Sequence, residues 1–259
     1  MSYETILLNK EDGVAVITLN RPPMNPLNSK VYSELAQAAD ELQADDSVKA
    51  VIITGAGSKA FAAGADVAEM ATLTPVEVYQ FCQGSKTCVD KIENLGKPVI
   101  AAIRGFTFGG GCELTLACDY RLAADNAKFS LPETGLGIIP GNGATQRLPR
   151  LIGAAKAKEL IFLGDIIDAA SAEKIGLVNK VVSIDTLLEE AKAVAKRMAG
   201  KPTVAIKMAK EAINTGSNVD IHAGLAFEIQ AFVTAFASAD AKEGLGAFLE
   251  KRKPNYTGK

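Results

Sequence analysis

The sequence predicts an α/β fold followed by a helical C-terminal region, and three observations lead to this prediction. Apolar runs typical of strands alternate with segments of helical periodicity up to about residue 182. Two of these runs lead into glycine-rich segments. After about residue 184 the strand pattern stops, and consecutive helical segments follow. With 259 residues and 48% hydrophobic content, the chain can form one large domain with an appended subdomain.

The first predicted elements are a β-hairpin, a helix and a buried strand. Thr5–Leu8 and Val14–Leu19 are apolar runs joined by Lys10-Glu-Asp-Gly13, which is a hairpin signature. A helix with Ser29 as its N-cap comes next, because apolar residues follow it at helical spacing. Ala50–Thr54 is a continuous apolar run, which is typical of a strand that is buried on both faces.

The same order is then predicted a second time. A helix over about residues 75–95 precedes a strand at Pro98–Ile103, and this strand leads into a triple glycine and a short helix. Further strands are predicted at Tyr120–Ala124, Ala127–Ser130 and Val178–Val182. The alternation of strand, loop and helix favours an α/β architecture.

The C-terminal part of the chain is predicted to be helical. Four helices are expected, at Ile184–Ala199, Thr203–Thr215, Asp220–Ala237 and Ala239–Glu250. The segment Gly200-Lys-Pro202 separates the first two of them. We therefore place the core at residues 1–198 and a helical subdomain at residues 199–259.

The charge balance argues against several classes of partner. The chain has 28 basic and 30 acidic residues, so its formal net charge of −2 provides no global attraction for nucleic acid or anionic membrane. The start, Met1-Ser-Tyr-Glu4, has no basic and apolar leader pattern, and no apolar run is long enough to cross a bilayer. We expect a cytoplasmic protein without a nucleic-acid or membrane partner.

The sequence has few residues that could bind a metal or act as a thiol nucleophile. The four cysteines, Cys82, Cys88, Cys112 and Cys118, form no CxxC pair, and His222 is the one histidine. The first two cysteines lie on a predicted helix and the other two flank another, so we expect small buried thiols. Packing is the expected role of His222, and no metal site is expected.

Two glutamates lie in segments that are almost free of other charges. Glu113 is the only charged residue between Arg104 and Asp119, and the next charge after Glu133 is Arg147. A carboxylate in apolar surroundings binds its proton more tightly, which suits a general acid or base. Each glutamate also has a simpler explanation. Glu113 could complement a helix dipole, and Glu133 could bind nearby backbone amides.

Two glycine-rich loops can present free backbone N–H groups. Ala62-Ala-Gly-Ala-Asp66 follows one strand region, and Gly109-Gly-Gly111 follows another. Two such donors that converge on one oxygen would stabilise an enolate-like charge. Alternatively, the glycines allow close helix packing and Asp66 caps a helix that begins near Val67. Neither loop matches GxGxxG or Walker A. The combination of two isolated glutamates with two donor loops favours catalysis.

Four segments, in this order and spacing, resemble those of the enoyl-CoA hydratase (crotonase) family over essentially the whole chain. They are Phe61–Asp66, Phe108–Leu114, Leu131–Glu133 and Gly137–Leu148. This resemblance implies a crotonase-like spiral of ββα turns in residues 1–198, followed by a helical trimerisation subdomain in residues 199–259. It also implies a homo-hexamer made of two trimers.

The resemblance implies an enzyme, a hydro-lyase that adds water reversibly to a trans-2-enoyl-CoA to give an (S)-3-hydroxyacyl-CoA. A short acyl chain, as in crotonyl-CoA, and a place in fatty acid or butanoate metabolism are expected. The N–H groups of Ala65 and Gly110 would hold the thioester oxygen. Glu113 would act as base on water, Glu133 would protonate the α-carbon, and Gly141 would help to position the water. No cofactor is needed, since CoA is part of the substrate.

The resemblance also assigns CoA contacts to Ala63, Asp66, Phe248 and Lys251, the last two near the adenine and contributed by a neighbouring subunit. The chain departs from the family pattern at several points. Val67-Ala-Glu69 lacks a lysine that many relatives carry, Asn142 and Ala144 replace a small residue and glycine, and Arg104 and Thr107 replace Asn and Ala.

Other functions also remain open from the sequence. Within the same superfamily, double-bond isomerisation often works with a single carboxylate, and thioester hydrolysis or decarboxylation are further options. The presence of both Glu113 and Glu133 argues against them. A non-catalytic RNA-binding module is a further alternative, and the net charge of −2 argues against it.

Overall fold

A computed structural model describes residues 3–259 and shows two β-sheets. The six-stranded sheet has the order β1-β2-β3-β5-β7-β10, and the four-stranded sheet has the order β4-β6-β8-β9. The strands are β1 Ile6–Glu11, β2 Val14–Leu19, β3 Ala50–Gly55, β4 Ala60–Ala63, β5 Val99–Ile103, β6 Phe106–Phe108, β7 Tyr120–Ala124, β8 Lys128–Ser130, β9 Ile167–Asp168 and β10 Lys180–Val182. From β3 to β8, each turn of the chain adds one strand to each sheet, so the predicted ββα spiral is present.

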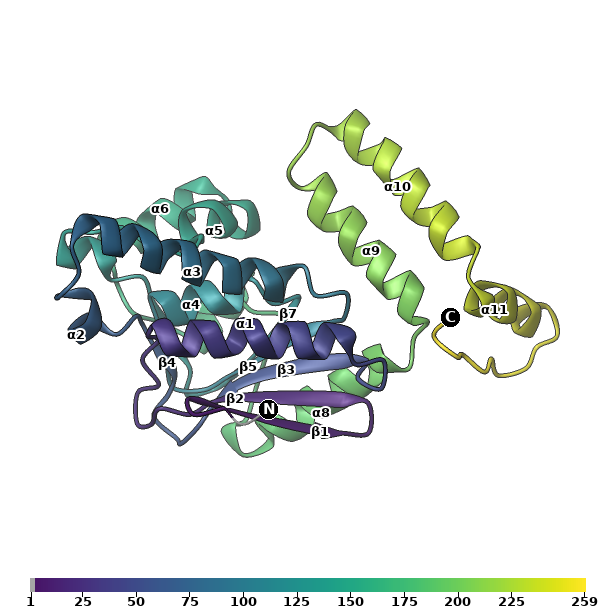
Figure 1. The fold of residues 1–259 in the computed structure, drawn as a ribbon, viewed down its shortest axis with the longest axis horizontal. Helices are drawn as coiled ribbons and strands as arrows, with labels where there is room; N and C mark the ends of the chain where they lie inside the picture. The colour runs from purple at the N-terminus through teal and green to yellow at the C-terminus, as the bar shows by residue number, and fades with distance from the viewer. Residues whose placement is uncertain (1–2) are drawn as a thin grey trace.

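Helices surround the sheets and extend beyond them (Figure 1). The α-helices are α1 Ser29–Ala44, α2 Val67–Met70, α3 Pro75–Glu93, α4 Gly110–Leu116, α5 Ala144–Ile152, α6 Ala154–Leu163, α7 Ala169–Lys174, α8 Leu187–Ala199, α9 Thr203–Gly216, α10 Ile221–Phe236 and α11 Ala239–Leu249. Two 3₁₀ helices are η1 Glu133–Leu136 and η2 Ile184–Thr186. The sequence did not predict β4, β6, β9 or the helices α5, α6 and α7.

The six-stranded sheet is covered on both faces, which explains the continuous apolar runs of its central strands. All residues of β3 and β5 are buried. One face packs in the main core with α1 and α3, and the other face packs against α8 through side chains at helical spacing, Leu187, Ala191 and Ala195. Helix α8 therefore lies on the core sheet, although its sequence pattern resembles that of the helices that follow it.

Two helix starts show how local chemistry sets the boundaries. The N-cap of α1 is Asn28 and not Ser29, because the Asn28 side chain accepts a hydrogen bond from the Val31 N–H at 3.0 Å. The Ser29 hydroxyl instead donates to Glu69 at 2.7 Å. Helix α3 begins with a capping box, in which Thr74 and Glu77 satisfy each other's backbone N–H groups.

Helix α4 lies directly against strand β4 without a side chain between them. A Cβ added at Gly111 would lie 2.0 Å from the Ala62 carbonyl oxygen, so this position requires glycine. Cys112 lies inside α4 rather than beside it, which corrects the predicted placement. Of the four thiols, Cys88, Cys112 and Cys118 are buried and Cys82 is half-buried.

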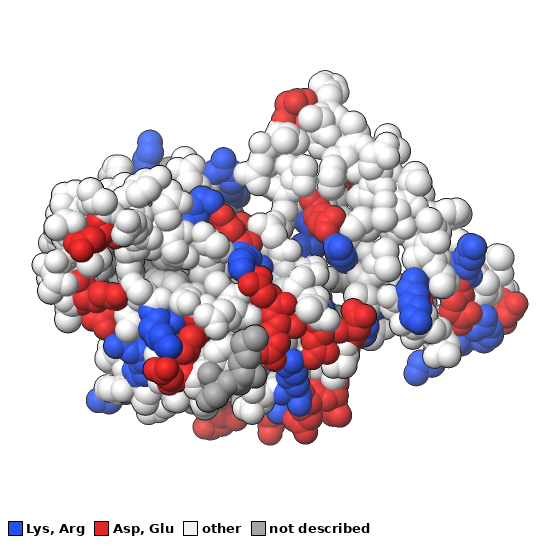
Figure 2. All heavy atoms as spheres, in the orientation of Figure 1, with Lys and Arg blue, Asp and Glu red and all other residues white. Residues whose placement is uncertain are grey.

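The helices α9 and α10 form an antiparallel arm that extends from the spiral, with α11 beyond it (Figure 1). Helix α9 is tied to the spiral by an ion pair between Lys210 and Asp119 at 2.8 Å and by a hydrogen bond that Asn214 donates to the Glu93 carbonyl at 3.2 Å. Figure 2 shows few charged side chains on the visible face of this arm. Large apolar side chains are exposed on these helices, among them Ile213, Ile221, Leu225, Ile229, Phe232 and Phe236.

In residues 3–259, no single helix has the length and apolar character needed to cross a membrane. Helices α10 and α11 meet those criteria only as a pair, and they are bent by 75° relative to each other.

Candidate active site

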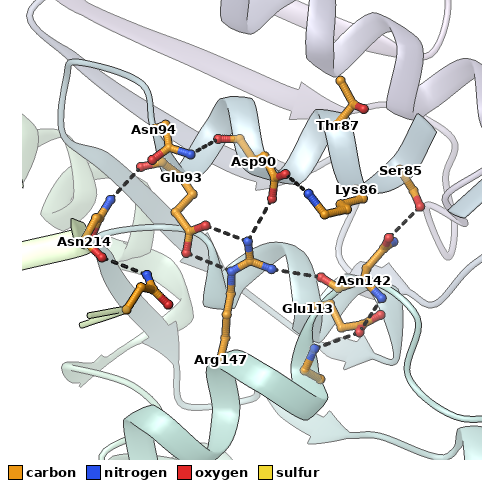
Figure 3. Close-up of polar contacts among 12 residues, drawn as sticks. Ser85, Lys86, Thr87, Asp90, Glu93, Asn94, Glu113, Asn142, Arg147 and Asn214 are labelled. Carbon is orange, nitrogen blue, oxygen red and sulfur yellow. Dashed lines mark hydrogen bonds and ion pairs between the residues drawn. The ribbon is translucent and has the colours of Figure 1, made fainter. Parts of the chain in front are cut away.

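Glu113 lies in α4 and is held by backbone amides from a distant loop (Figure 3). Its Oε1 accepts hydrogen bonds from the N–H groups of Asn142 at 2.8 Å and Ala144 at 3.0 Å. Oε2 accepts no hydrogen bond from any residue between 3 and 259. Burial raises the pKa of Glu113, while the two amide bonds and the positive charge of Arg147 oppose that rise. Oε1 is thus held in place, and Oε2 is free to accept a hydrogen bond from another group.

Glu133 is the first residue of η1, and its carboxylate has a different environment. Its Oε2 is buried, and no group in the described part of the chain donates a hydrogen bond to it. The alternative of a loop carboxylate that binds amides does not account for this oxygen. Burial raises the pKa of Glu133 to about 7, and the negative charge of Glu113 adds to the rise. A carboxyl group with this pKa is substantially protonated near neutral pH.

Two backbone N–H groups lie next to each other beside these carboxylates. Ala65 follows β4, Gly110 begins α4, and a Cβ built on Gly110 would lie 3.6 Å from the Ala65 nitrogen. Neither N–H donates to another group within residues 3–259. The preceding residue, Gly109, has a φ of 47°, and its N–H donates to the Ser130 carbonyl at 2.9 Å. This positive φ turns the chain so that the first N–H of α4 stays free, as an oxyanion hole needs.

The loop that holds Glu113 is itself anchored by side chains (Figure 3). Ser85 donates to the Asn142 side chain at 2.5 Å, and the Asn142 amide donates to the Tyr32 hydroxyl at 2.7 Å. Arg147 donates to the Asn142 carbonyl at 3.2 Å and pairs with Glu93 through two bonds, at 2.8 and 2.6 Å. The sequence analysis did not assign these residues to the site. A sequence feature that could have indicated Arg147 is that it is the first charged residue after Glu133.

The residues Asp66 and Ala63 have structural partners that bear on their predicted contact with CoA. The Asp66 carboxylate caps α2 by accepting from the Glu69 N–H at 3.4 Å, and it pairs with Arg21 at 2.9 Å. This is the capping role considered from the sequence. Ala63 is the last residue of β4, next to the donor loop. Both residues lie beside the free N–H of Ala65, so they remain predicted CoA contacts.

The remaining predicted site residues are not all brought together. Gly141 is exposed and immediately precedes the loop residue that binds Glu113; its N–H has no acceptor in the described residues. Phe248 is 82% exposed near the end of α11, and Lys251 follows it. Figure 1 places α11 beyond the arm, away from α2 and α4. Within one chain these two residues do not join the site.

No metal-binding cluster of three or more His, Cys, Asp or Glu side chains occurs in residues 3–259. His222 is an exposed residue in the first turn of α10. The prediction that catalysis needs no metal or cofactor stays a prediction.

Comparison with known proteins gives the family. A sequence model of the family described as enoyl-CoA hydratase/isomerase matches residues 9–259. The chain belongs to the enoyl-CoA hydratase/isomerase family. A crotonyl-CoA hydratase of Syntrophomonas wolfei subsp. wolfei is 48% identical to it, with 100% of each chain covered. A short-chain-enoyl-CoA hydratase of Clostridium acetobutylicum is 47% identical over 98% of this chain and 97% of the relative.

Solved structures of this family share the fold. The crystal structure of an enoyl-CoA hydratase from Bacillus anthracis matches with a TM-score of 0.95 and 44% sequence identity, over 99% of this chain and 100% of that one. An enoyl-CoA hydratase from Geobacillus kaustophilus matches with a TM-score of 0.97 and 37% identity, over 100% and 98% of the two chains. The predicted family and the crotonase-like fold are confirmed.

Proposed function

We propose that this protein is an enoyl-CoA hydratase, a hydro-lyase that adds water reversibly to a short-chain trans-2-enoyl-CoA such as crotonyl-CoA. Two relatives whose names specify crotonyl-CoA or short-chain enoyl-CoA, at 48% and 47% identity over nearly full length, support this function. The observation that carries the proposal is a pair of carboxylates with different hydrogen bonding, one held by two amides and one with a buried oxygen that has no donor in the described residues, beside two free N–H groups.

The free N–H groups of Ala65 and Gly110 provide the electrophilic activation. They would donate hydrogen bonds to the thioester oxygen, which draws electron density from the conjugated double bond and makes the β-carbon electrophilic. When water attacks, negative charge moves onto that oxygen. Fixed donors in a buried site stabilise this enolate-like charge more than they stabilise the neutral thioester.

The two carboxylates divide the proton transfers between them. In its ionised form, Glu113 takes a proton from water through Oε2, as the water oxygen bonds to the β-carbon. Glu133 is protonated and delivers its proton to the α-carbon, where the enolate electron pair forms the C–H bond. The raised pKa of Glu133, about 7, suits the proton donor. The Gly141 N–H would help to hold the water, and the (S) product is expected from the family.

Recognition of CoA is proposed to involve two chains. Ala63 and Asp66 lie beside the donor loop, while Phe248 and Lys251 would reach the adenine end of CoA in a neighbouring copy. The exposed apolar side chains of α9 and α10 support assembly through this arm. A hexamer made of two trimers, a cytoplasmic location and a role in fatty acid or butanoate metabolism belong to the same proposal.

The first test follows the ultraviolet absorbance of the conjugated enoyl thioester when the protein is mixed with crotonyl-CoA. We expect rapid loss in the wild type and a loss of rate of about 10² to 10⁴ in both Glu133→Gln and Glu113→Gln. The control is Glu159→Gln, an exposed glutamate paired only with Lys156. If both site variants hydrated crotonyl-CoA at the wild-type rate, the proposal would be wrong. Conversion of a 3-enoyl-CoA that survives Glu113→Gln would indicate an isomerase.

A further inference from the structure

Asn142 makes hydrogen bonds through its backbone N–H, its carbonyl and its side chain, and the N–H binds Glu113. Its N–H donates to Glu113 Oε1 at 2.8 Å, and its carbonyl accepts from Arg147 at 3.2 Å. Its side chain lies between Ser85 and Tyr32, at 2.5 and 2.7 Å. Asn142 is 8% exposed and Tyr32 is 2% exposed, so this polar cluster lies inside the protein. A buried, fully bonded network of this kind fixes a single arrangement.

The second anchor, Arg147, is itself fixed in place. Its guanidinium makes two parallel bonds to Glu93, at 2.8 and 2.6 Å, and a longer contact of 3.3 Å to Asp90 (Figure 3). Its side chain is only 20% exposed. Bidentate pairing orients a guanidinium as well as holding it. The remaining arm of Arg147 is therefore directed at the Asn142 carbonyl.

We propose that Asn142 and Arg147 are positioning residues for the hydration reaction: together they hold the backbone segment whose N–H groups fix Glu113 Oε1, so that Oε2 faces the water. This inference rests on the proposed function. Neither residue touches the reacting atoms. They act through Glu113, since misplacement of a base by a small distance lowers the rate strongly.

Arg147 has an electrostatic effect on Glu113 in addition to its geometric one. The titratable groups that interact with Glu113 come from five elements: Tyr32 of α1, Cys82 of α3, Cys112 of α4, Glu133 of η1 and Arg147 of α5. Arg147 is the cation in this set, and it favours the ionised form of Glu113. Removal of its charge will raise the pKa of Glu113, so the base will be protonated up to a higher pH.

The main test is Arg147→Gln with crotonyl-CoA as substrate. We expect kcat to fall about 10- to 100-fold while KM changes less than about threefold. The acid limb of the profile of kcat/KM against pH should move to higher pH. Arg150→Gln is the matched control, because Arg150 lies in the same helix, is exposed and donates only to Gln146. It should leave both the rate and the pH profile unchanged.

A double-mutant cycle separates positioning from general damage. If Arg147 acts through Glu113, then Arg147→Gln will lower the residual activity of Glu113→Gln less than about twofold. The proposal is overturned if the two losses multiply, or if the acid limb of Arg147→Gln stays at its wild-type pH. If wild-type protein does not hydrate crotonyl-CoA, the proposed function fails instead.

Two further measurements test the roles of Asn142 and Arg147 independently. If Arg147→Gln does not fold, Asn142→Ala tests the same backbone segment, which holds Glu113. It should lower kcat about 3- to 10-fold with little change in KM, because the N–H remains but its side-chain anchors are lost. Carbon NMR titration of the Glu113 carboxyl, assigned with Glu113→Gln, reports its pKa without any substrate. An equal pKa in wild type and Arg147→Gln would contradict the electrostatic part, whereas Arg147→Lys keeps the positive charge and should keep the Glu113 pKa near its wild-type value.

Discussion

Glu113 and Glu133 lie on neighbouring elements of one site, but the regions that hold them differ in hydrogen bonding. Glu113 has one oxygen bound by two amides, those of Asn142 in the loop before α5 and of Ala144 at the first position of α5. Glu133 has a buried oxygen without any donor in the described residues, and its pKa is raised to about 7. The same side chain therefore has two different environments. In the proposed mechanism this difference in surroundings, rather than the residue type, separates the acid from the base.

The largest expected effect separates the two carboxylates by their pH dependence. Glu113→Gln should remove the acid limb of the kcat/KM profile, because this limb reports ionisation of the base. Glu133→Gln should remove the alkaline limb, because this limb reports deprotonation of the acid. Both variants should lose about 10²- to 10⁴-fold in rate. The two groups titrate as a coupled pair, so apparent values belong to the pair. A reversed pattern of lost limbs would exchange the two roles.

A smaller effect is expected when only the surroundings of Glu133 are changed. A Cβ at Gly109 would lie 2.7 Å from Glu133 Oε1, and the φ of 47° disfavours any other residue. Gly109→Ala should lower kcat about 10- to 100-fold, because it displaces the proton donor and disturbs the turn that keeps the Gly110 N–H free. Gly135→Ala is the control, since its added Cβ meets no atom within 4 Å. Equal activity of the two variants, measured with crotonyl-CoA, would show that Glu133 tolerates the shift.

The smallest expected effect concerns stability. Glu133 has a raised pKa in the folded protein, so between about 4.5 and about 7 the folded state holds more protons than the unfolded chain. The free energy of unfolding therefore falls as pH rises through this window. Glu133→Gln should be more stable than wild type by about 1 kcal/mol at pH 8, a value discounted for partial exposure, with a much smaller gain at pH 5.

Thermal unfolding of Glu133→Gln and wild type at both pH values measures this difference. Glu159→Gln serves again as the exposed control and should show no pH-dependent gain. If Glu133→Gln gave the same gain at pH 5 as at pH 8, the cause would not be ionisation of this carboxyl.

Much of the spiral could be predicted because its signals are local. The apolar runs of β3 and β5 and the hairpin turn are read directly from neighbouring residues. The helices α5 to α7 were missed because they are short and are interrupted by Pro149 and Gly153, so no long periodic pattern develops. The N-cap of α1 was misplaced by one residue, since both Asn28 and Ser29 are good caps.

The site residues also fall into two groups, those that the local sequence predicts and those that depend on the tertiary fold. The two glutamates could be found from their charge-free surroundings. Their partners could not, because the amides of Asn142 and Ala144 are backbone groups 29 and 31 residues from Glu113. A backbone N–H carries no residue-specific signal, and its direction is set by the folded loop. The Arg147–Glu93 pair joins residues 54 positions apart and depends equally on the tertiary fold.

The contact of α4 with β4 also limits how the sequence can change during evolution. Because an alanine at position 111 would bring a Cβ within 2.0 Å of the Ala62 carbonyl, descendants that keep this fold must keep glycine there, whatever reaction they catalyse. In the proposed function, selection retains the glutamates at 113 and 133 only while the chemistry is needed. A relative that lost its activity would replace them first, and the glycine would persist as a record of the shared architecture.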